Sequence, residues 1–539
     1  MPDAVEPQSL ERLEDARFLT GHGNFVADLN ADGQAHAVFV RSDYAHAGIK
    51  GVDTAQAVAM PGVIGVYTDA DLAPHNLNPL PCSAFVEFVS PLVTPPRRAL
   101  ARGRVRHVGD PVALVVAETA AQARDAAEAI TIDYAPLPAV ADATEALADG
   151  APAIWDDAPG NLAFRFQAGD AAATRKAMEA AAHVVELELV NNRITAMPLE
   201  PRAGIGGYDA ASDRYTLNFT GQGLHGIRDQ LAEVFGLPKD RFHLTAPDVG
   251  GGFGMKNFIY PEWVLLPWAA KRLGRPVKWV AERGEDFAAA THGRDMRVKA
   301  RLGLDADMTF LALEAEMVSN MGAYLSSVAP NIPCRSAPTA MGGVYAVPHV
   351  FMDVKGAFTN TACVDAYRGA GKPEANYLTE RLVEAAARRL GVDPLEIRRR
   401  NVITAFPHTS ALGIVIDGGR FAANIDDAEA RADRAGFAAR RAASEANGKL
   451  RGLGFACFLE TARAEPEEGA EVLFTPAGRI ELRLGTESNG QGHETTFAQI
   501  AGARFGLPLD AFDYIQADTD RTRMGHGHGG ARTMHMGGG

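Results

Sequence analysis

Two segments of this chain carry the same pattern, and this internal repeat is the feature that most restricts its fold. The first copy reads GQGLHGIRDQLAEVFGLPKDRFHLTAPD at 221–248, and the second reads GQGHETTFAQIAGARFGLPLDAFDYIQAD at 490–518. Both contain GQG, a helical pattern of similar length, FGLP and a final Asp, and both run on into a glycine-rich stretch. Such self-similarity indicates two copies of one supersecondary unit. We therefore expect two related α+β domains.

Apolar periodicity predicts the elements around the first copy. Runs that alternate every second residue predict strands, and apolar positions that recur every three or four residues predict helices. Strands are expected at 35–42, 111–118, 184–190, 215–220 and 241–248, and helices at 118–130 and 225–235. Together these elements form an N-terminal α+β unit followed by the first repeat.

Composition excludes several classes of protein. The formal charge of −14 argues against a nucleic-acid partner, and no apolar run approaches the ~18 residues of a membrane span. The acidic N-terminus lacks the apolar core of a secretory signal, so we expect a cytoplasmic protein. The four cysteines form no C-x-x-C pair, which argues against a zinc site or iron–sulfur cluster held by this chain.

The first glycine turn has two interpretations. A strand, G-x-G-x-x-G, a helix, a strand and a terminal acid match a dinucleotide-binding unit built on Gly221, Gly223, Gly226 and Asp248. The second copy keeps the glutamine but has Glu494 and Thr495 where the third glycine would be. This favours the second interpretation, in which Gln222 and Gln491 hold one polar ligand from two sides. A nicotinamide-dependent dehydrogenase remains the alternative.

Several longer motifs resemble a known family. They are TGQG at 220–223, DVGGGFGMKN at 248–257, AYRGAGKPEANYLTERLVEAAA at 366–387 and GTESNGQGHETTFAQIA at 485–501. In order and neighbourhood they resemble the molybdopterin-binding large subunit of the xanthine dehydrogenase and aldehyde oxidase family, especially its carbon monoxide dehydrogenase-like bacterial members. EDARFLTGHGNFVADLNADGQAHAVFVRSDYAHAGI at 14–49 and PLEPRA at 198–203 resemble it too, so the resemblance covers essentially the whole chain.

The resemblance implies an α+β fold with an N-terminal a/b hammerhead domain and two related molybdenum-cofactor domains, the second incomplete. The expected boundaries are a tail at 1–20, the hammerhead domain at 21–140, a linker at 141–170, and cofactor domains at 171–405 and 406–539.

The same resemblance implies the residues of the site. Gln222 is expected to hydrogen-bond an oxygen on molybdenum, which the pterin holds without protein metal ligands. Catalytic roles are expected for Gln222, Phe253 and Arg368, whose guanidinium can stabilise negative charge on a substrate. The expected cofactor-binding set adds Gly252, Gly254, Gly369, Ala370, Gln491, Gly492, His493 and Arg532. The family's general base is a glutamate in a G-E motif close to the C-terminus of a longer chain, and no position in these 539 residues matches that motif; Glu200 and Glu494 lie in other motifs.

The expected reaction is hydroxylation of an aldehyde, an N-heterocycle or a similar small molecule, with water as the oxygen donor. The implied cofactor is molybdenum-molybdopterin in its cytosine dinucleotide form. The implied partners are a small iron–sulfur subunit and a medium FAD subunit in a dimer of heterotrimers. Carbon monoxide dehydrogenase proper carries a copper-binding cysteine where Gly369 follows Arg368, and purine-oxidising members carry glutamate and phenylalanine at the positions of Asn257 and Ala370. Carbon monoxide oxidation and a non-catalytic cofactor-binding fragment are the further alternatives.

The glycine-rich stretch GHGHGGARTMHMGGG at 525–539 allows two interpretations. Its histidines at 526, 528 and 535 offer a weak metal-binding signal. We favour a loop whose backbone amides and Arg532 face an anionic cofactor tail.

Overall fold

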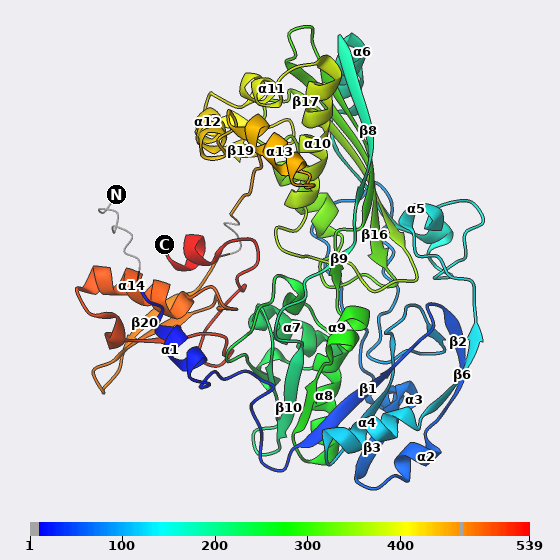
Figure 1. Cartoon of the computed structure of the whole chain (residues 1–539). Coiled ribbons are helices and arrows are strands. Elements are labelled where there is room, and N and C mark those ends of the chain that lie inside the picture. The colour runs from blue at the N-terminus through cyan, green and yellow to red at the C-terminus, as the bar shows by residue number, and fades with distance from the viewer. Residues whose placement is uncertain (1–9, 463–466) are drawn as a thin grey trace.

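A computed structural model describes residues 10–462 and 467–539, so positions 1–9 of the expected tail lie outside the described residues. Three of the six sheets in the described residues matter for the site: a seven-stranded sheet that includes the N-terminal strands, a five-stranded sheet packed against α10, and a three-stranded sheet beside the C-terminus (Figure 1). The fold is α+β, as expected.

The first sheet has seven strands in the order β12-β11-β10-β13-β1-β5-β3. Its strands are β12 (Phe242–Thr245), β11 (Arg214–Phe219), β10 (Ala203–Asp209), β13 (Val277–Val280), β1 (Ala35–Arg41), β5 (Pro111–Ala117) and β3 (Val63–Thr68). β5 is buried at every position, which explains its unbroken apolar sequence. Because β1 pairs with β13, the N-terminal unit and the first repeat share one sheet.

The helices of this region cover that sheet. α4 (Ala120–Glu128) packs on β1 and β5, and α8 (Pro261–Leu273) packs on β10, β11 and β13. α7 (Leu224–Phe235) packs on β12 and buries its apolar face. The predicted strands and helices of both units are therefore confirmed within a few residues.

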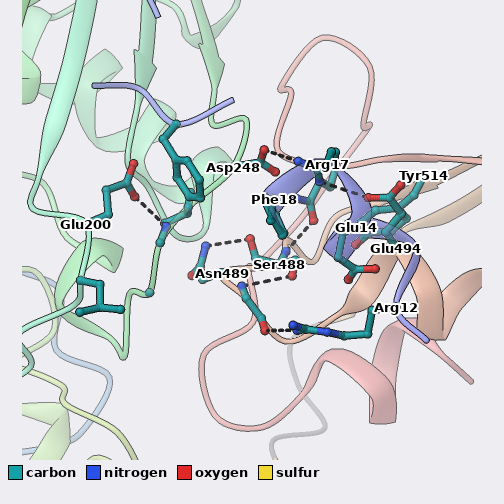
Figure 2. Close-up of a pocket in the computed structure, with 17 residues that line it drawn as sticks. Arg12, Glu14, Arg17, Phe18, Glu200, Asp248, Ser488, Asn489, Glu494 and Tyr514 are labelled. Atoms are coloured by element: carbon teal, nitrogen blue, oxygen red, sulfur yellow. Dashed lines mark hydrogen bonds and ion pairs between the residues drawn. The ribbon is translucent and has the colours of Figure 1, made fainter. Parts of the chain in front are cut away.

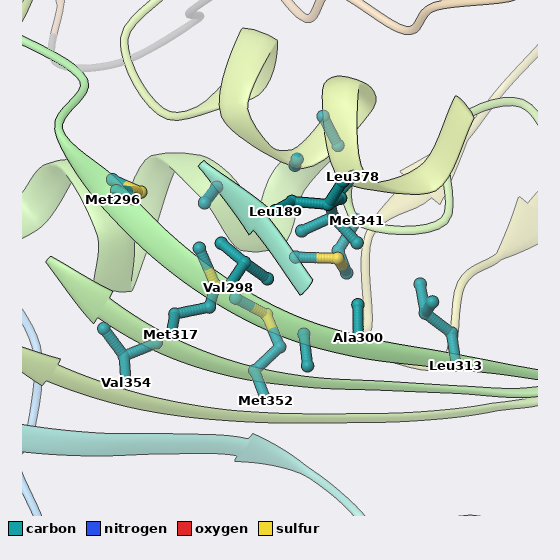
Figure 3. Close-up of a cluster of buried hydrophobic side chains, with 14 of the residues drawn as sticks. Leu189, Met296, Val298, Ala300, Leu313, Met317, Met341, Met352, Val354 and Leu378 are labelled. Atoms are coloured by element: carbon teal, nitrogen blue, oxygen red, sulfur yellow. The ribbon is translucent and has the colours of Figure 1, made fainter. Parts of the chain in front are cut away.

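The second sheet has five strands in the order β7-β17-β16-β15-β8. They are β7 (Leu162–Gly169), β17 (His349–Phe358), β16 (Phe310–Gly322), β15 (Met296–Leu304) and β8 (His183–Asn191). Leu378 of α10 (Lys372–Leu390) packs over this sheet among methionines and valines, the core drawn in Figure 3.

Two stretches differ from the expected organisation. The expected linker includes β7, an edge strand that pairs antiparallel with β17. Its sequence contains Ala and Gly and has little strand-like periodicity. At the start of the expected second cofactor domain, α12 (Phe421–Arg431) packs on α11 (Pro394–Asn401), and its Ile425 joins the core below α10.

The internal repeat is confirmed as a repeat of structure. In the second copy β20 (Ala470–Phe474), β21 (Ile480–Leu484), α14 (His493–Phe505) and β22 (Phe512–Ile515) follow in the order of β10, β11, α7 and β12. Both copies pair their first two strands antiparallel and the last two parallel. The copies meet where Ala246 N–H donates to the Ala517 carbonyl oxygen at 3.0 Å. α1 (Leu13–Leu19), within the expected tail, packs on α14.

Candidate functional site

Gln222 lies in the turn between β11 and α7, and its buried side-chain amide is held in one orientation. Its Oε1 accepts the backbone N–H groups of Gly254 at 3.0 Å and Lys256 at 3.2 Å. Because only the oxygen can accept, the position of Nε2 is settled as well, and it donates to Nε2 of His528. Gln222 therefore presents its donor group on the side that faces the second repeat.

The glycine-rich loop 250–257 brings backbone against this amide. Gly251, Phe253 and Gly254 have φ values of 92°, 54° and 102°, so the loop depends on left-handed backbone. A Cβ on Gly252 would lie 2.3 Å from Cδ of Gln222, so no other residue fits there without displacing the amide. The Phe253 side chain is 40% exposed.

The loop that contains Arg368 packs beside Phe253. Arg368 N–H donates to the carbonyl oxygen of Phe253 at 2.8 Å, and its guanidinium lies 5.6 Å from the centre of the phenyl ring. Arg294 donates to the carbonyl oxygen of Arg368 at 2.7 Å and so fixes the loop. Gly369 and Ala370 follow with φ of 86° and 25°. The exposed Arg368 side chain is thus anchored through its backbone while its charge faces outward.

The second repeat adds two groups. Glu487, only 2% exposed, accepts the backbone N–H of Gly223 at the start of α7. Burial raises the pKa of Glu487 to about 7. His528 Nδ1 lies 4.0 Å from Oε1 of Glu487, and burial lowers the pKa of His528 to about 3, so its ring is neutral and accepts from Gln222. Glu487 is not among the site residues expected from the sequence, and its one signal is its place three residues before Gly490.

Two polar atoms near Gln222 are buried without a hydrogen-bond partner among the described residues. They are Oδ1 of Asn489 and Nδ1 of His528. A Cβ on Gly252 would lie 2.9 Å from Asn489 Oδ1, so this oxygen faces the same glycine as Gln222 does. Buried polar atoms are rarely left unpaired in native proteins. These two atoms suit the polar groups of a ligand held between the repeats.

Similarity to named proteins extends over almost the whole of this chain. The nicotine 6-hydroxylase large subunit of Paenarthrobacter nicotinovorans is 34% identical over 98% of this chain and 66% of its own length. The carbon monoxide dehydrogenase large chain of Hydrogenophaga pseudoflava is 33% identical over 97% of this chain and 68% of its own. The chain belongs to the xanthine dehydrogenase and aldehyde oxidase family. It spans about two thirds of the length of these family members.

Family models and solved structures agree. The a/b hammerhead domain of aldehyde oxidase and xanthine dehydrogenase matches 20–138, and two molybdopterin cofactor-binding domains match 154–402 and 427–539. Quinoline 2-oxidoreductase from Pseudomonas putida 86 superposes with a TM-score of 0.90 at 34% identity, covering 97% of this chain and 68% of that one. Carbon monoxide dehydrogenase from Oligotropha carboxidovorans superposes with a TM-score of 0.91 at 32% identity, covering 98% of this chain and 69% of that one.

Membership of this family replaces the dinucleotide interpretation of the first glycine turn. The N–H of Gly223 binds the Glu487 carboxyl group, Gly226 lies inside α7, and Asp248 pairs with Arg17. Within the described part of the chain, no group of three or more His, Cys, Asp or Glu side chains is arranged to hold a metal ion. No helix of those residues is long and apolar enough to cross a bilayer.

The second glutamine lies apart from the first. Gln491 is exposed, and its Oε1 accepts the backbone N–H of Asn489 in its own loop. The expectation that both amides face one ligand is not met here, because the second GQG turn folds its glutamine back onto the preceding residues. Gly492 begins α14 with φ of 81°, and His493 is buried with a pKa lowered to about 4 by burial.

The C-terminal loop also differs from the expectation. Arg532 is fully buried and pairs with Glu468, whose carboxylate also accepts the N–H of His526 at 3.1 Å. Sequence analysis did not anticipate this partner, because Glu468 lies outside every motif. The loop reaches Gln222 through His528, the middle one of its three histidines.

A cavity of about 430 Å³ lies between the two repeats and is lined in part by Asn489 and Gly251 (Figure 2). It lies between 248–251 of the first repeat and 488–490 of the second, with α1 as a third wall. Arg17 of α1 bridges both repeats, pairing with Asp248 and with Glu494 at 3.2 Å. Neither Gln222 nor Gln491 lines this cavity.

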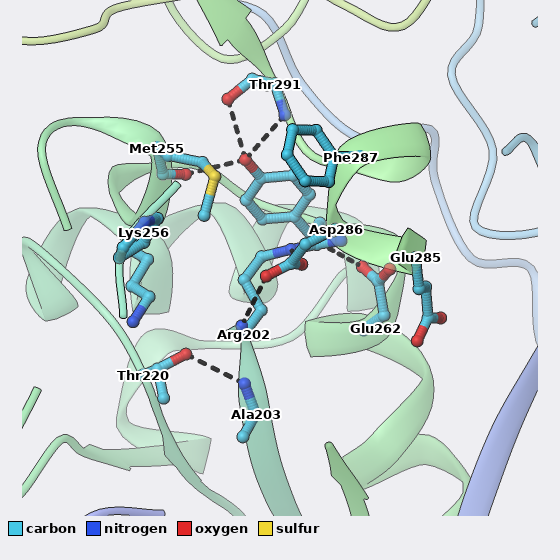
Figure 4. A network of polar contacts seen from close by, with 12 residues as sticks. Arg202, Ala203, Thr220, Met255, Lys256, Glu262, Glu285, Asp286, Phe287 and Thr291 are labelled. Carbon is cyan, nitrogen blue, oxygen red and sulfur yellow. Dashed lines mark hydrogen bonds and ion pairs between the residues drawn. The ribbon is translucent and has the colours of Figure 1, made fainter. Parts of the chain in front are cut away.

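A buried ionic network centred on Arg202 lies within the first cofactor domain (Figure 4). Arg202, fully buried, pairs with Glu262 at 3.1 Å and with Asp286 at 2.8 Å. Arg41 of β1 pairs with the other oxygen of Glu262 at 2.6 Å. Since a buried charge is tolerated only when it is paired, these contacts lock the hammerhead strand to the cofactor domain.

Proposed function

We propose that this chain is the molybdenum-bearing part of a hydroxylase that oxidises a small N-heterocycle or aldehyde with water as the oxygen donor. The observation that carries the proposal is the buried Gln222 amide, whose oxygen is held by two backbone N–H groups and whose donor group is aimed between the repeats. When bound, the molybdenum-pterin group would supply the redox chemistry.

The residues present suit that group. Nε2 of Gln222 has two hydrogens, so it can donate to His528 and to an oxygen of the cofactor at once. Gly252 and Gly254 let the loop pack closely on Gln222 and Ala366, because a Cβ on either would meet those residues within 2.6 Å. The unpaired Asn489 Oδ1 and His528 Nδ1 offer an acceptor and a donor for further polar groups.

Phe253 and Arg368 form the side that a substrate would meet. The ring of Phe253 is partly exposed, and the guanidinium of Arg368 lies beside it with its backbone anchored. A planar heterocycle can pack on such a ring, and the nearby guanidinium favours negative charge that develops on the substrate. Gly369 and Ala370 contribute no bulk to this side.

Two arguments favour an N-heterocycle. Relatives of this chain are named for nicotine and quinoline, both nitrogen heterocycles. Gly369 follows Arg368 where carbon monoxide dehydrogenase proper carries its copper-binding cysteine, and this argues against a carbon monoxide dehydrogenase-type activity.

The partners belong to the same proposal. Relatives are named as large or gamma subunits, so we infer a small iron–sulfur subunit and a medium FAD subunit that accept the electrons, in a dimer of heterotrimers. We also infer a cytosine dinucleotide on the pterin and a cytoplasmic location.

Elemental analysis tests the proposal. The chain, purified with its proposed partner subunits from cells that make molybdopterin, should carry molybdenum, and Gln222→Ala should lose most of it while keeping its circular dichroism spectrum. Gly226→Ala, inside α7, is the control and should keep its metal. A wild-type complex without molybdenum would refute the proposal, and turnover of carbon monoxide but of no heterocycle would redirect it.

A further inference from the structure

Lys256 lies at the end of the glycine-rich loop, and its charged side chain is buried away from solvent. The residue is fully buried, and its Nζ lies 3.1 Å from Oε2 of Glu200 and 2.9 Å from the Glu200 carbonyl oxygen. Burial lowers the pKa of Lys256, and the nearby Glu200 carboxylate opposes that shift. A lysine is rarely placed so deep in a protein unless it is paired.

The two partners hold opposite ends of one loop. Glu200 Oε2 accepts the N–H of Gly250 at 2.7 Å, and Glu200 N–H donates to the Gly250 carbonyl oxygen at 3.1 Å. At the other end, the N–H of Lys256 donates to Gln222 Oε1, and Gln222 N–H donates back to the Lys256 carbonyl oxygen at 2.9 Å. The Lys256–Glu200 pair therefore joins the start of the loop to its end.

The loop between these ends needs such a closure. Phe253 has a positive φ without being glycine, a conformation that persists only where the surroundings fix it. Its neighbours Gly251 and Gly254 are left-handed as well. Without the ion pair, the end of the loop would keep its bonds to Gln222 and that of the Tyr260 hydroxyl group to the Met255 carbonyl oxygen, but it would lose its side-chain link to the start of the loop at Gly250.

We propose that Lys256 is a positioning residue, whose buried bond to Glu200 clamps the loop 250–256 and thereby holds the Gln222 amide in its single orientation. Lys256 itself does not reach the substrate side formed by Phe253 and Arg368. The inference rests on the proposed function for its catalytic meaning, but the clamp is a property of the protein alone.

The test therefore uses the cofactor-free full chain. In Lys256→Met, hydrogen exchange of the amides at 250–256 should become at least about tenfold faster, because a charge-assisted hydrogen bond contributes a factor of that size to local opening. With isotope-labelled glutamine, the side-chain NH₂ signal of Gln222, assigned by its loss in Gln222→Ala, should shift or broaden. Lys256→Arg, which keeps the charge, should recover part of the protection.

Two further variants keep the test decisive. Lys278→Met removes another buried lysine, whose Nζ donates to the carbonyl oxygen of Ala27 at 2.7 Å, and should leave the Gln222 signal unchanged. If Lys256→Met does not fold, the double variant Glu200→Gln/Lys256→Met, which leaves no unpaired charge, should fold and show the same loosening. An unchanged Gln222 signal in either folded variant would overturn the clamp, while absence of molybdenum from the wild type would refute only the proposed function.

Discussion

Glu487 should make the stability of the second repeat depend on pH in a defined direction. Its carboxyl group is buried against the N–H of Gly223, and burial raises its pKa from 4.5 to about 7. For a group whose pKa is higher in the folded chain, stabilisation is complete below the unfolded pKa and is lost as the pH rises through the folded value. A difference of about 2.5 pKa units at 1.36 kcal/mol each gives a loss of about 3 kcal/mol between pH 4.5 and pH 8.

The variant Glu487→Gln keeps the shape and the acceptor for Gly223 but cannot ionise. The free energy of unfolding, measured by urea titration at half-unit pH steps, should fall relative to this variant by about 3 kcal/mol from pH 4.5 to pH 8. Hydrogen exchange in β21 and β22 would locate the change. Glu188→Gln, which alters a carboxylate whose side chain is 72% exposed, should leave the wild-type profile unchanged. Parallel curves for wild type and Glu487→Gln would refute the reasoning.

Three other substitutions test the packing. Gly252→Ala places a methyl group 2.3 Å from Cδ of Gln222, so it should cost about 1–3 kcal/mol in urea unfolding and reduce molybdenum content. Gly226→Ala lies inside α7, where a Cβ meets nothing within 4 Å, and should stabilise the chain by about 0.5–1 kcal/mol. A loss of stability would contradict the placement of Gly226 inside this helix. Leu378→Ala empties the core below α10 and should cost about 2–5 kcal/mol by urea titration; a cost under 1 kcal/mol would argue against the packing described.

The sequence predicted those parts of the fold that leave a local pattern. The repeat around Gln222 and Gln491 appeared because both copies keep the same turn, helix and strand. The strand β7 lies in a segment predicted to be a linker, because an edge strand next to a Pro- and Gly-rich stretch has little periodicity of its own. Membership of the family came from the order of whole motifs rather than from any single residue.

The contacts of the site were harder to predict, because they join residues far apart in the chain. Glu487 meets Gly223 across 264 positions, and His528 meets Gln222 across 306. Nothing in the neighbouring residues encodes such a pairing. For the same reason the burial of Arg532 against Glu468 and the exposure of Gln491 could be read only from the fold. The roles expected for Phe253, Arg368 and the glycines around them stay predictions.

The pairing of β1 with β13 sets an order of events during synthesis. Ala35 finds its strand neighbour only at Val277, so a ribosome must deliver the chain as far as that strand before this edge of β1 is covered. Until then this edge of β1 stays unpaired, although β5 can already pair with its other edge. A holding chaperone would find its target at that open edge, which waits for residues made much later.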